Sequence, residues 1–309
     1  MNFAKLILFR MRRKVVITGA TGFVGSNLTR YLLERKIEVY IIVRPTSDIT
    51  FLEKNDDNLN IFTYDQDIKK LISFFSEIQP DSVFHLASNI VAEHKSNQID
   101  SLIQSNITFG LHLLEAMKET GVKKLVNTGT FWQHYNNDDY NPVCLYAATK
   151  QAFESLIEYY VQANGFKVVT LKLFDTYGEN DKRPKLINLL NKFADEQTEL
   201  NMSPGEQVLN LVHVNDVCHA FYSAQELLHN NKDSYHLKYC VANSKTHTLK
   251  EVIEIFELVS NKKVNVIWGG RPYRKREVMK PWVNGEVLPN WEANISLEEG
   301  LKRIKLYQF

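Results

Sequence analysis

A glycine-rich turn near the start of the chain constrains the fold more than any other feature. Segment 14–25 is KVVITGATGFVG, a β-branched run followed by Gly19, Gly22 and Gly25, and a helix-like stretch covers residues 26–35. A strand that turns directly into a helix presents free N–H groups and the positive end of the helix dipole to an anion. The pattern therefore predicts a dinucleotide-binding site on an α/β fold. The alternative is a glycine-rich turn without a ligand.

Length and composition allow an ordinary globular protein. The 309 residues, 44% apolar and 24% charged, suffice for one large α/β domain or two smaller ones. The formal net charge of +1 gives no reason to expect nucleic acid as a partner. Cys144, Cys218 and Cys240 lack metal-ligand spacing, which favours reduced thiols in a cytoplasmic protein, and we expect no metal site.

Membrane and targeting signals are not expected from the sequence. No apolar run reaches the roughly 20 residues that a membrane helix needs. The order of apolar and basic residues at the N-terminus is the reverse of a signal peptide. We expect residues 1–11 to form a disordered tail.

Strand-like and helix-like segments alternate along the first half of the chain. Further short apolar runs occupy 39–43, 60–63, 82–86, 124–127 and 167–173, and helix-like stretches occupy 68–77, 100–120 and 145–164. Buried strands that alternate with helices indicate a doubly wound parallel Rossmann sheet, which we place at residues 12–175. Beyond it, longer polar loops separate the elements. We expect residues 176–309 to form mainly a smaller C-terminal α/β substrate lobe, with some segments returning to the Rossmann domain.

A second pattern, Tyr146-Ala-Ala-Thr-Lys150, opens one of the helix-like stretches. Residues four apart share a helix face, so the phenol and the ammonium can point into one cleft. The ammonium is expected to lower the pKa of the phenol toward the range of acid–base work. Upstream, Thr128 and Thr130 end a strand where such folds bind substrates. We expect a catalytic role for Thr128 rather than strand-end capping, whereas Thr130 can equally be a loop-packing residue.

These motifs, in this order, resemble the extended short-chain dehydrogenase/reductase family, in particular its branch of sugar-nucleotide epimerases, dehydratases and reductases. His85-Leu-Ala-Ser88 resembles a cofactor loop of that family and Asn106 its mid-helix asparagine. Segments 171–178 and 205–216 resemble two later landmarks, so the resemblance covers nearly the whole chain. Segments 127–132 and 273–279 are similar to 4-keto sugar reductases of the CDP-abequose synthase type.

The resemblance implies a nicotinamide cofactor. The strand at 39–43 is followed by Arg44 and no acidic residue, which favours the 2′-phosphate of NADP over the ribose of NAD, although NAD is possible. Asp65 is expected at the adenine amine; a helix N-cap is the alternative. The predicted cofactor-binding residues are Gly19, Thr21, Gly22, Phe23, Val24, Gly25, Arg44, Asp65, Gln66, Leu86, Ala87, Ser88, Asn106, Tyr146 and Lys150.

The expected reaction is reduction of a keto group, at C4 of a nucleotide-linked deoxyhexose, with Thr128, Tyr146 and Lys150 as catalytic residues. Tyr146 would donate a proton while Thr128 binds the carbonyl oxygen. Gly129 and Thr130 stand where related dehydratases have carboxylates, which argues against dehydration. The alternative is an NAD-dependent 4-epimerase. A carbonyl reductase of non-nucleotide compounds and a non-catalytic nucleotide sensor are weaker alternatives.

Three positions depart from the family pattern. Leu209 replaces an arginine that binds phosphate in many relatives, Asp175 replaces an asparagine, and Lys172 replaces another arginine. Arg274, in a basic segment, is expected to supply the missing charge. The predicted substrate-binding residues are Thr130, Trp132, Asp175 and Arg274. The resemblance also implies a homodimer through helices 100–120 and 145–164.

Overall fold

The centre of the molecule is a seven-stranded sheet in which all neighbouring strands are parallel. The structure is a computed structural model that describes residues 13–50, 56–230, 233 and 235–306. The strand order is β11-β6-β5-β4-β1-β2-β3, and it reverses between β1 and β4. The strands are β1 (Lys14–Thr18), β2 (Glu38–Val43), β3 (Leu59–Thr63), β4 (Ser82–His85), β5 (Lys124–Thr130), β6 (Lys167–Leu173) and β11 (Tyr235–Val241). The predicted doubly wound Rossmann sheet is confirmed.

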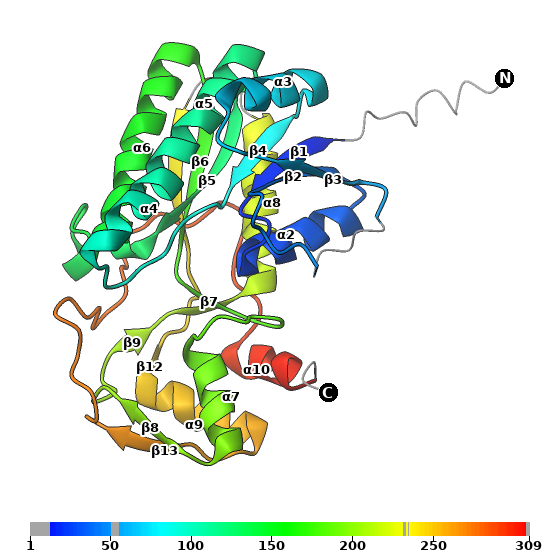
Figure 1. Cartoon of the computed structure of the whole chain (residues 1–309). Coiled ribbons are helices and arrows are strands. Elements are labelled where there is room, and N and C mark those ends of the chain that lie inside the picture. Colours follow the sequence, from blue (N-terminus) through cyan, green and yellow to red (C-terminus); the bar gives the residue numbers. More distant parts are fainter. Residues whose placement is uncertain (1–12, 51–55, 231–232, 234, 307–309) are drawn as a thin grey trace.

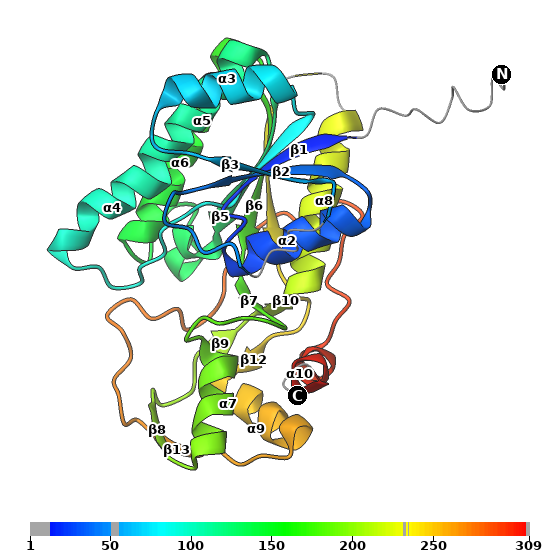
Figure 2. The ribbon, with the colours of Figure 1, turned by 45° about the vertical axis from the view of Figure 1, so that its right-hand side comes forward.

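Helices cover both faces of this sheet (Figures 1 and 2). On β1, Val15 and Ile17 pack in one apolar cluster while Val16 packs in the other, as alternation along a strand requires. One face is covered by α2 (Phe23–Glu34) and α8 (Val214–Asn230). The other is covered by α3 (Ile68–Ile78), α5 (Phe109–Thr120) and α6 (Leu145–Asn164). The strands are continuous apolar runs because both of their faces are buried.

Two helices differ from their predicted bounds. Helix α2 starts at Phe23 rather than at residue 26, because Gly22 is its N-cap. The predicted helix 100–120 consists of α4 (Ile99–Ile103), a π-helical turn η2 (Gln104–Thr108) and α5. Inserted π turns are frequent at functional sites, and this turn carries Asn106.

A smaller lobe lies beyond the carboxyl ends of the sheet strands (Figure 1). Its core joins α7 (Leu186–Glu196), α9 (Leu249–Ser260) and α10 (Leu297–Leu306). Short strands pair in three two-stranded sheets. The pairs are β7 (Asp175–Tyr177) with β10 (Leu211–His213), β9 (Val208–Leu209) with β12 (His247–Thr248), and β8 (Glu199–Met202) with β13 (Asn265–Trp268). Although α8 and β11 come from the second half of the chain, they pack on or in the seven-stranded sheet.

The three cysteines are free thiols, two of them buried. Across the described ranges, no helix is both long enough and apolar enough to cross a membrane. The predicted tail at residues 1–11 lies outside the described residues.

Candidate active site

A cavity of about 1510 Å³ opens at the carboxyl ends of the sheet strands and is lined by residues of both the sheet and the lobe. It reaches Gly19 after β1 and Leu86 after β4, where the strand order reverses. Open α/β sheets bind ligands at this point of the topology. Every site residue predicted from the sequence lines the cavity, except Asn106.

The glycine-rich turn forms one wall. Gly19 has φ +73°, and a Cβ there would lie 2.6 Å from the backbone nitrogen of Ala87. A Cβ on Gly25 would lie 2.1 Å from the carbonyl oxygen of Gly19. Both positions therefore require glycine, one for its backbone conformation and both for close approach. The first turn of α2 contains no acidic residue, so its N–H groups and dipole are available to an anion.

The loop after β4 is held by Asn106. Its side-chain oxygen accepts hydrogen bonds from the backbone nitrogen of Asn89 (2.7 Å) and from the hydroxyl of Ser88 (3.2 Å). Its amide nitrogen donates to the carbonyl oxygen of Asn89 and to the hydroxyl of Thr149. Asn106 is buried and lies behind the cavity wall. Its contacts fit a residue that positions the loop, rather than the direct cofactor contact that the sequence predicted.

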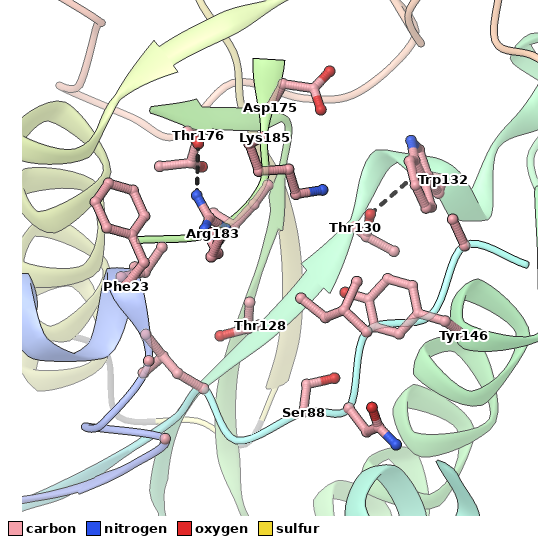
Figure 3. Close-up of a pocket in the computed structure, with 18 of the residues that line it drawn as sticks. Phe23, Ser88, Thr128, Thr130, Trp132, Tyr146, Asp175, Thr176, Arg183 and Lys185 are labelled. Atoms are coloured by element: carbon pink, nitrogen blue, oxygen red, sulfur yellow. Dashed lines mark hydrogen bonds between the residues drawn. The ribbon is translucent and has the colours of Figure 1, made fainter. Parts of the chain in front are cut away.

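Tyr146 lies at the start of α6 with its side chain in the cavity (Figure 3). Burial raises the pKa of its phenol, and hydrogen bonding to Ser88 and Thr130 only partly opposes this effect. The direction is opposite to the lowering that was expected from the lysine nearby. At neutral pH the phenol is therefore protonated and suited to donate a proton.

Lys150 follows one helical turn later and is also buried. Burial lowers the pKa of its ammonium to about 8, an effect that the Glu154 carboxylate opposes. The two residues of the predicted pair thus share one helix face and one cavity.

The two threonines of β5 occupy different surroundings. Thr128 donates its hydroxyl hydrogen to the carbonyl oxygen of His85 at 2.9 Å, and in Figure 3 this hydroxyl points away from Tyr146. Thr130 accepts a hydrogen bond from the backbone nitrogen of Trp132 at 3.3 Å and lies beside the Tyr146 phenol. In this structure Thr130, not Thr128, is the threonine next to the phenol.

Arg44 and Asp65 lie at the other end of the cavity, after β2 and β3. Arg44 is exposed, and its backbone nitrogen donates to the Ser47 hydroxyl at 3.0 Å. Asp65 is ion-paired with Lys70 at 2.5 Å, which lowers the pKa of the Asp65 carboxyl. Helix capping was the alternative role considered for Asp65. The N-cap of α3 is Asp67, two residues later.

Arg183 lines the cavity from the connection between β7 and α7, although no motif in the sequence singles it out. Its guanidinium binds the Asp181 carboxylate through two hydrogen bonds of 2.7 Å. It donates a third to the carbonyl oxygen of Thr176 and lies 4.4 Å from the ring centre of Phe23. A residue outside the sheet thus contacts the first residue of α2. No local sequence pattern predicts such a contact, since it arises only from the packing of the lobe against the Rossmann domain.

The lobe side of the cavity carries more cationic than anionic side chains. Arg271, Arg274 and Lys185 line it together with Asp175 and Leu209. Burial raises the pKa of the Asp175 carboxyl, and the charges of Lys185 and Arg274 oppose this effect. Excess positive charge around a cleft favours an anionic ligand. Lys185, like Arg183, was not predicted.

The remaining candidates have structural surroundings. His85 is fully buried, and its Nδ1 lies 2.8 Å from the Thr18 hydroxyl. The Trp132 ring meets that of Tyr146 edge-on, with centroids 6.4 Å apart. Among the described residues, no group of three His, Cys, Asp or Glu side chains is arranged to hold a metal ion.

Comparison with known sequences gives a consistent result. The sequence model of a family described as "NAD dependent epimerase/dehydratase family" matches residues 15–237. CDP-abequose synthase of Yersinia pseudotuberculosis is 28% identical over 269 residues, which cover 87% of this chain and 91% of the relative. UDP-glucuronate 4-epimerase of Thermodesulfobacterium geofontis is 26% identical, with 93% and 94% covered.

Solved structures share the fold. A UDP-N-acetylglucosamine 4-epimerase from Methanobrevibacter ruminantium superposes with a TM-score of 0.83 at 21% identity, over 96% of this chain and 98% of the other. A UDP-glucose-4-epimerase from Stenotrophomonas maltophila with bound NAD gives 0.82 at 20% identity, with the same coverage.

Proposed function

Because the chain belongs to the NAD dependent epimerase/dehydratase family, we propose that it reduces a keto group, at C4 of a nucleotide-linked deoxy sugar, with NADPH. Membership confirms the resemblance drawn from the sequence and makes the chain an NAD(P)-dependent enzyme of the extended short-chain type. The CDP-abequose synthases and UDP-sugar 4-epimerases among its relatives support a nucleotide sugar as substrate.

The observation that carries the proposal is the buried Tyr146 phenol in the cavity, with Lys150 one turn behind it on the same helix. Tyr146 would donate its proton to the oxygen of the keto group as that oxygen gains negative charge. Thr130, beside the phenol, would orient the same oxygen by a hydrogen bond. Thr128 could join it only by giving up its bond to the His85 carbonyl oxygen.

The residues present fit a nicotinamide dinucleotide. The turn at Gly19 and Gly25 would leave backbone groups open to a pyrophosphate, and Lys150, in the same cavity, would bind ribose hydroxyls. When bound, the cofactor supplies the hydride. Arg44 after β2, with no carboxylate beside it, favours the 2′-phosphate of NADP.

Elimination of water is less well supported. It needs an acid and a base near the sugar, and β5 offers no carboxylate at positions 129 and 130. A Cβ on Gly129 would lie 3.1 Å from Glu154 Oε1 and 3.0 Å from the Thr170 methyl group. A side chain at this position would therefore meet the buried residues beneath β5.

The second candidate is an NAD-dependent 4-epimerase. Relatives with that name favour it, and a 4-epimerase would use the same phenol to oxidise and then reduce one sugar. It would show no net change in the cofactor.

A substrate screen separates these reactions. The purified protein would be mixed with NADPH or NADH and with CDP-, dTDP-, GDP- and UDP-linked 4-keto-6-deoxyhexoses, and absorbance of the reduced cofactor followed. We expect consumption of NADPH with one nucleotide series. Interconversion of UDP-glucose or UDP-glucuronate without cofactor consumption would establish the epimerase instead. Reduction of simple ketones only, with none of the four nucleoside diphosphates bound, would favour the non-nucleotide carbonyl reductase.

We further propose a homodimer through the helices of segments 100–120 and 145–164, which are α4, η2 and α5 in the first and α6 in the second. Ile99, Ile103 and Tyr159 expose large apolar surfaces on these helices, and burial against a second copy would remove them from water. The free thiols fit a reducing compartment such as the cytoplasm.

A further inference from the structure

One segment of the lobe, residues 271–287, runs along the edge of the molecule from β13 to the sheet (orange in Figure 1); we call it the strap. It contributes Arg274, Glu277 and Pro281, among others, to the cavity wall. Its backbone is tied to the lobe, where Val208 N donates to Met279 O at 2.9 Å, and to the sheet, where Cys240 N donates to Glu286 O at 2.7 Å. The strap is therefore tied to the lobe at its midpoint and to the sheet near its carboxyl end.

The middle of the strap docks on residues 134–141, the connection that follows β5. The Trp282 ring stacks on the His134 imidazole, with centroids 3.8 Å apart and planes 8° from parallel. The backbone nitrogen of Val283 donates to Asn137 Oδ1 at 3.0 Å. The Arg276 guanidinium lies 4.2 Å from the ring centre of Tyr135.

A buried ammonium holds the imidazole under Trp282. Lys172, on β6, is almost fully buried and its Nζ lies 2.7 Å from His134 Nε2. An ammonium has only hydrogens to donate, so Nε2 accepts and His134 is neutral, with its proton on Nδ1. That proton is donated to the carbonyl oxygen of Asp138 at 3.1 Å. Both ring nitrogens are thus satisfied only in this tautomer and orientation.

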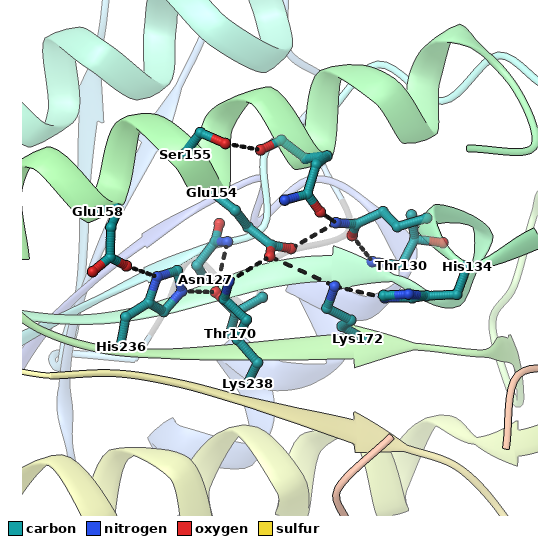
Figure 4. Close-up of polar contacts among 12 residues, drawn as sticks. Asn127, Thr130, His134, Glu154, Ser155, Glu158, Thr170, Lys172, His236 and Lys238 are labelled. Atoms are coloured by element: carbon teal, nitrogen blue, oxygen red, sulfur yellow. Dashed lines mark hydrogen bonds and ion pairs between the residues drawn. The ribbon is translucent and has the colours of Figure 1, made fainter. Parts of the chain in front are cut away.

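The Lys172 ammonium in turn lies beside Glu154, a buried carboxylate that is linked through Gln133 to Thr130 in the cavity (Figure 4). Lys172 Nζ lies 3.6 Å from Glu154 Oε2. The other oxygen, Oε1, accepts a hydrogen bond of 2.8 Å from the Gln133 amide. Gln133 Oε1 accepts one from the backbone nitrogen of Thr130 at 3.0 Å. A continuous set of contacts therefore joins the threonine beside the Tyr146 phenol to the tryptophan of the strap.

We propose that Lys172, His134 and Trp282 are positioning residues for substrate: they pin the strap, and with it Arg274, over the cavity. The inference rests on the proposed function, because it assigns the strap to the phosphates of a nucleotide sugar. Leu209 leaves the lobe wall without a charge at that position, and a strap fixed at its centre presents a guanidinium in its place. Preorganised charge binds an anion more tightly than the same charge on a mobile segment.

Two substitutions in the full-length protein test whether these contacts hold the strap. Trp282→Leu removes the stacked ring, and His134→Phe keeps a ring but removes the acceptor for Lys172. Matched controls on the strap are Val283→Ala, at a side chain that is 75% exposed, and Lys280→Gln, which removes one exposed charge. Should Trp282→Leu not fold, Gly285→Ala displaces the same ring, because a Cβ there would lie 2.6 Å from it.

Two readouts are measured: amide hydrogen exchange of 271–287, and calorimetric titrations with NADPH and with CDP, UDP, GDP and dTDP. We expect faster exchange confined to the strap and 134–141 in the pin variants. We expect about tenfold weaker binding of the nucleoside diphosphate that the wild type binds best, with NADPH affinity unchanged and both controls like wild type. Unchanged strap exchange overturns the inference, as does unchanged nucleotide affinity once exchange has risen.

Failure of the proposed function gives a different result. In that case none of the four diphosphates binds the wild type at all. The exchange measurement then still decides whether the three residues pin the strap, because it needs no ligand.

Discussion

At the scale of single residues, the site is governed by burial of two groups on one helix face. Removal from water disfavours the charged form of each, so it raises the pKa of the Tyr146 phenol and lowers that of the Lys150 ammonium. The phenol keeps its proton in the resting protein, which suits a donor. The ammonium stays charged at neutral pH, but by a narrow margin.

Replacing Tyr146 with Phe tests the donor. We expect kcat of keto reduction to fall by roughly 10²–10⁴-fold, the usual contribution of a positioned acid. NADPH affinity should change little, because only one hydroxyl is removed. Stopped-flow rates and fluorescence titration measure the two quantities. Tyr159→Phe, at an exposed position of the same helix, serves as control. A Tyr146→Phe enzyme with wild-type kcat would show that another group donates the proton.

The pKa of Lys150, lowered to about 8, predicts that kcat/KM declines on the alkaline side of its pH profile, a decline that we call the alkaline limb. As the pH rises through about 8 the ammonium loses its proton and its attraction for ribose oxygens, so kcat/KM should decline there. Folding stability has the opposite sign. The unfolded lysine titrates near 10.4 and binds more protons between these values, so this residue's contribution to stability increases as pH rises from 8 toward 10.4.

A pH–rate profile from pH 6 to 10 tests the limb, with Lys150→Arg for comparison. Arginine stays charged over the whole range, so the variant should be slower but lack the limb. A decline that is identical in both proteins would assign it to another group.

At the scale of elements, apolar pattern and local spacing were sufficient for the large sheet and its helices. Runs such as 167–173 are buried on both faces, and the observed β6 has the same bounds. The short strands β9 and β12 could not be predicted, because two-residue strands are defined by their partners rather than by their own side chains. The π-helical turn was missed for a similar reason. Its sequence is helical in pattern, and the insertion accompanies the contacts of Asn106.

The same contrast holds within the site. The glycine spacing and the Tyr146–Lys150 pair are local signals, and both line the cavity. Arg183 and Lys185 lie in an irregular connection and reach the cavity only because the lobe packs against the sheet. Hydrogen-bond direction is equally invisible in sequence, as the Thr128 hydroxyl shows by pointing to a backbone carbonyl group.

The close approach of α2 to the turn before it predicts the effect of Gly25→Ala. The added Cβ would lie 2.1 Å from Gly19 O, so the helix must shift. We expect a loss of about 1–3 kcal/mol in unfolding free energy, typical of overpacking, and at least tenfold weaker NADPH binding.

Gly165→Ala is the matched control for Gly25→Ala, with denaturant titration and NADPH titration as measurements. Gly165 has φ +69° and no neighbour within 4 Å of its Cβ position. The control should therefore lose stability without losing cofactor affinity. Tight NADPH binding by Gly25→Ala would contradict the assignment of the turn to the cofactor.

At the scale of the whole molecule, contacts between the Rossmann domain and the smaller lobe complete the cavity. Arg183 brings the connection before α7 against Phe23 of the glycine-rich turn, and the strap brings the lobe against 134–141. The Tyr146 phenol and the cations of the lobe line the same cavity. We therefore expect binding of cofactor and of nucleotide to depend on how the Rossmann domain and the lobe pack, which the sequence of neither part specifies alone.

The stability of the whole molecule should also fall on mild acidification, because several histidines are buried in neutral form. Burial lowers the pKa of His85 to about 3 and also lowers the pKa of His134 and His236. The unfolded chain binds these protons below its pKa of about 6.5 and the folded chain does not. The contribution to stability is complete above pH 6.5 and is lost as pH falls toward the folded values.

For His85 alone the loss at pH 5 is about 2 kcal/mol. Calorimetric Tm values from pH 8 to pH 5 should therefore decline below pH 6.5. His85→Asn, which cannot take up the proton, should show a shallower decline, while the exposed His94→Gln should follow the wild type. Because His134 belongs to the same group and holds Trp282, exchange of the strap should rise over the same pH range. A Tm that stays constant from pH 7 to pH 5 would contradict the neutral burial of these side chains.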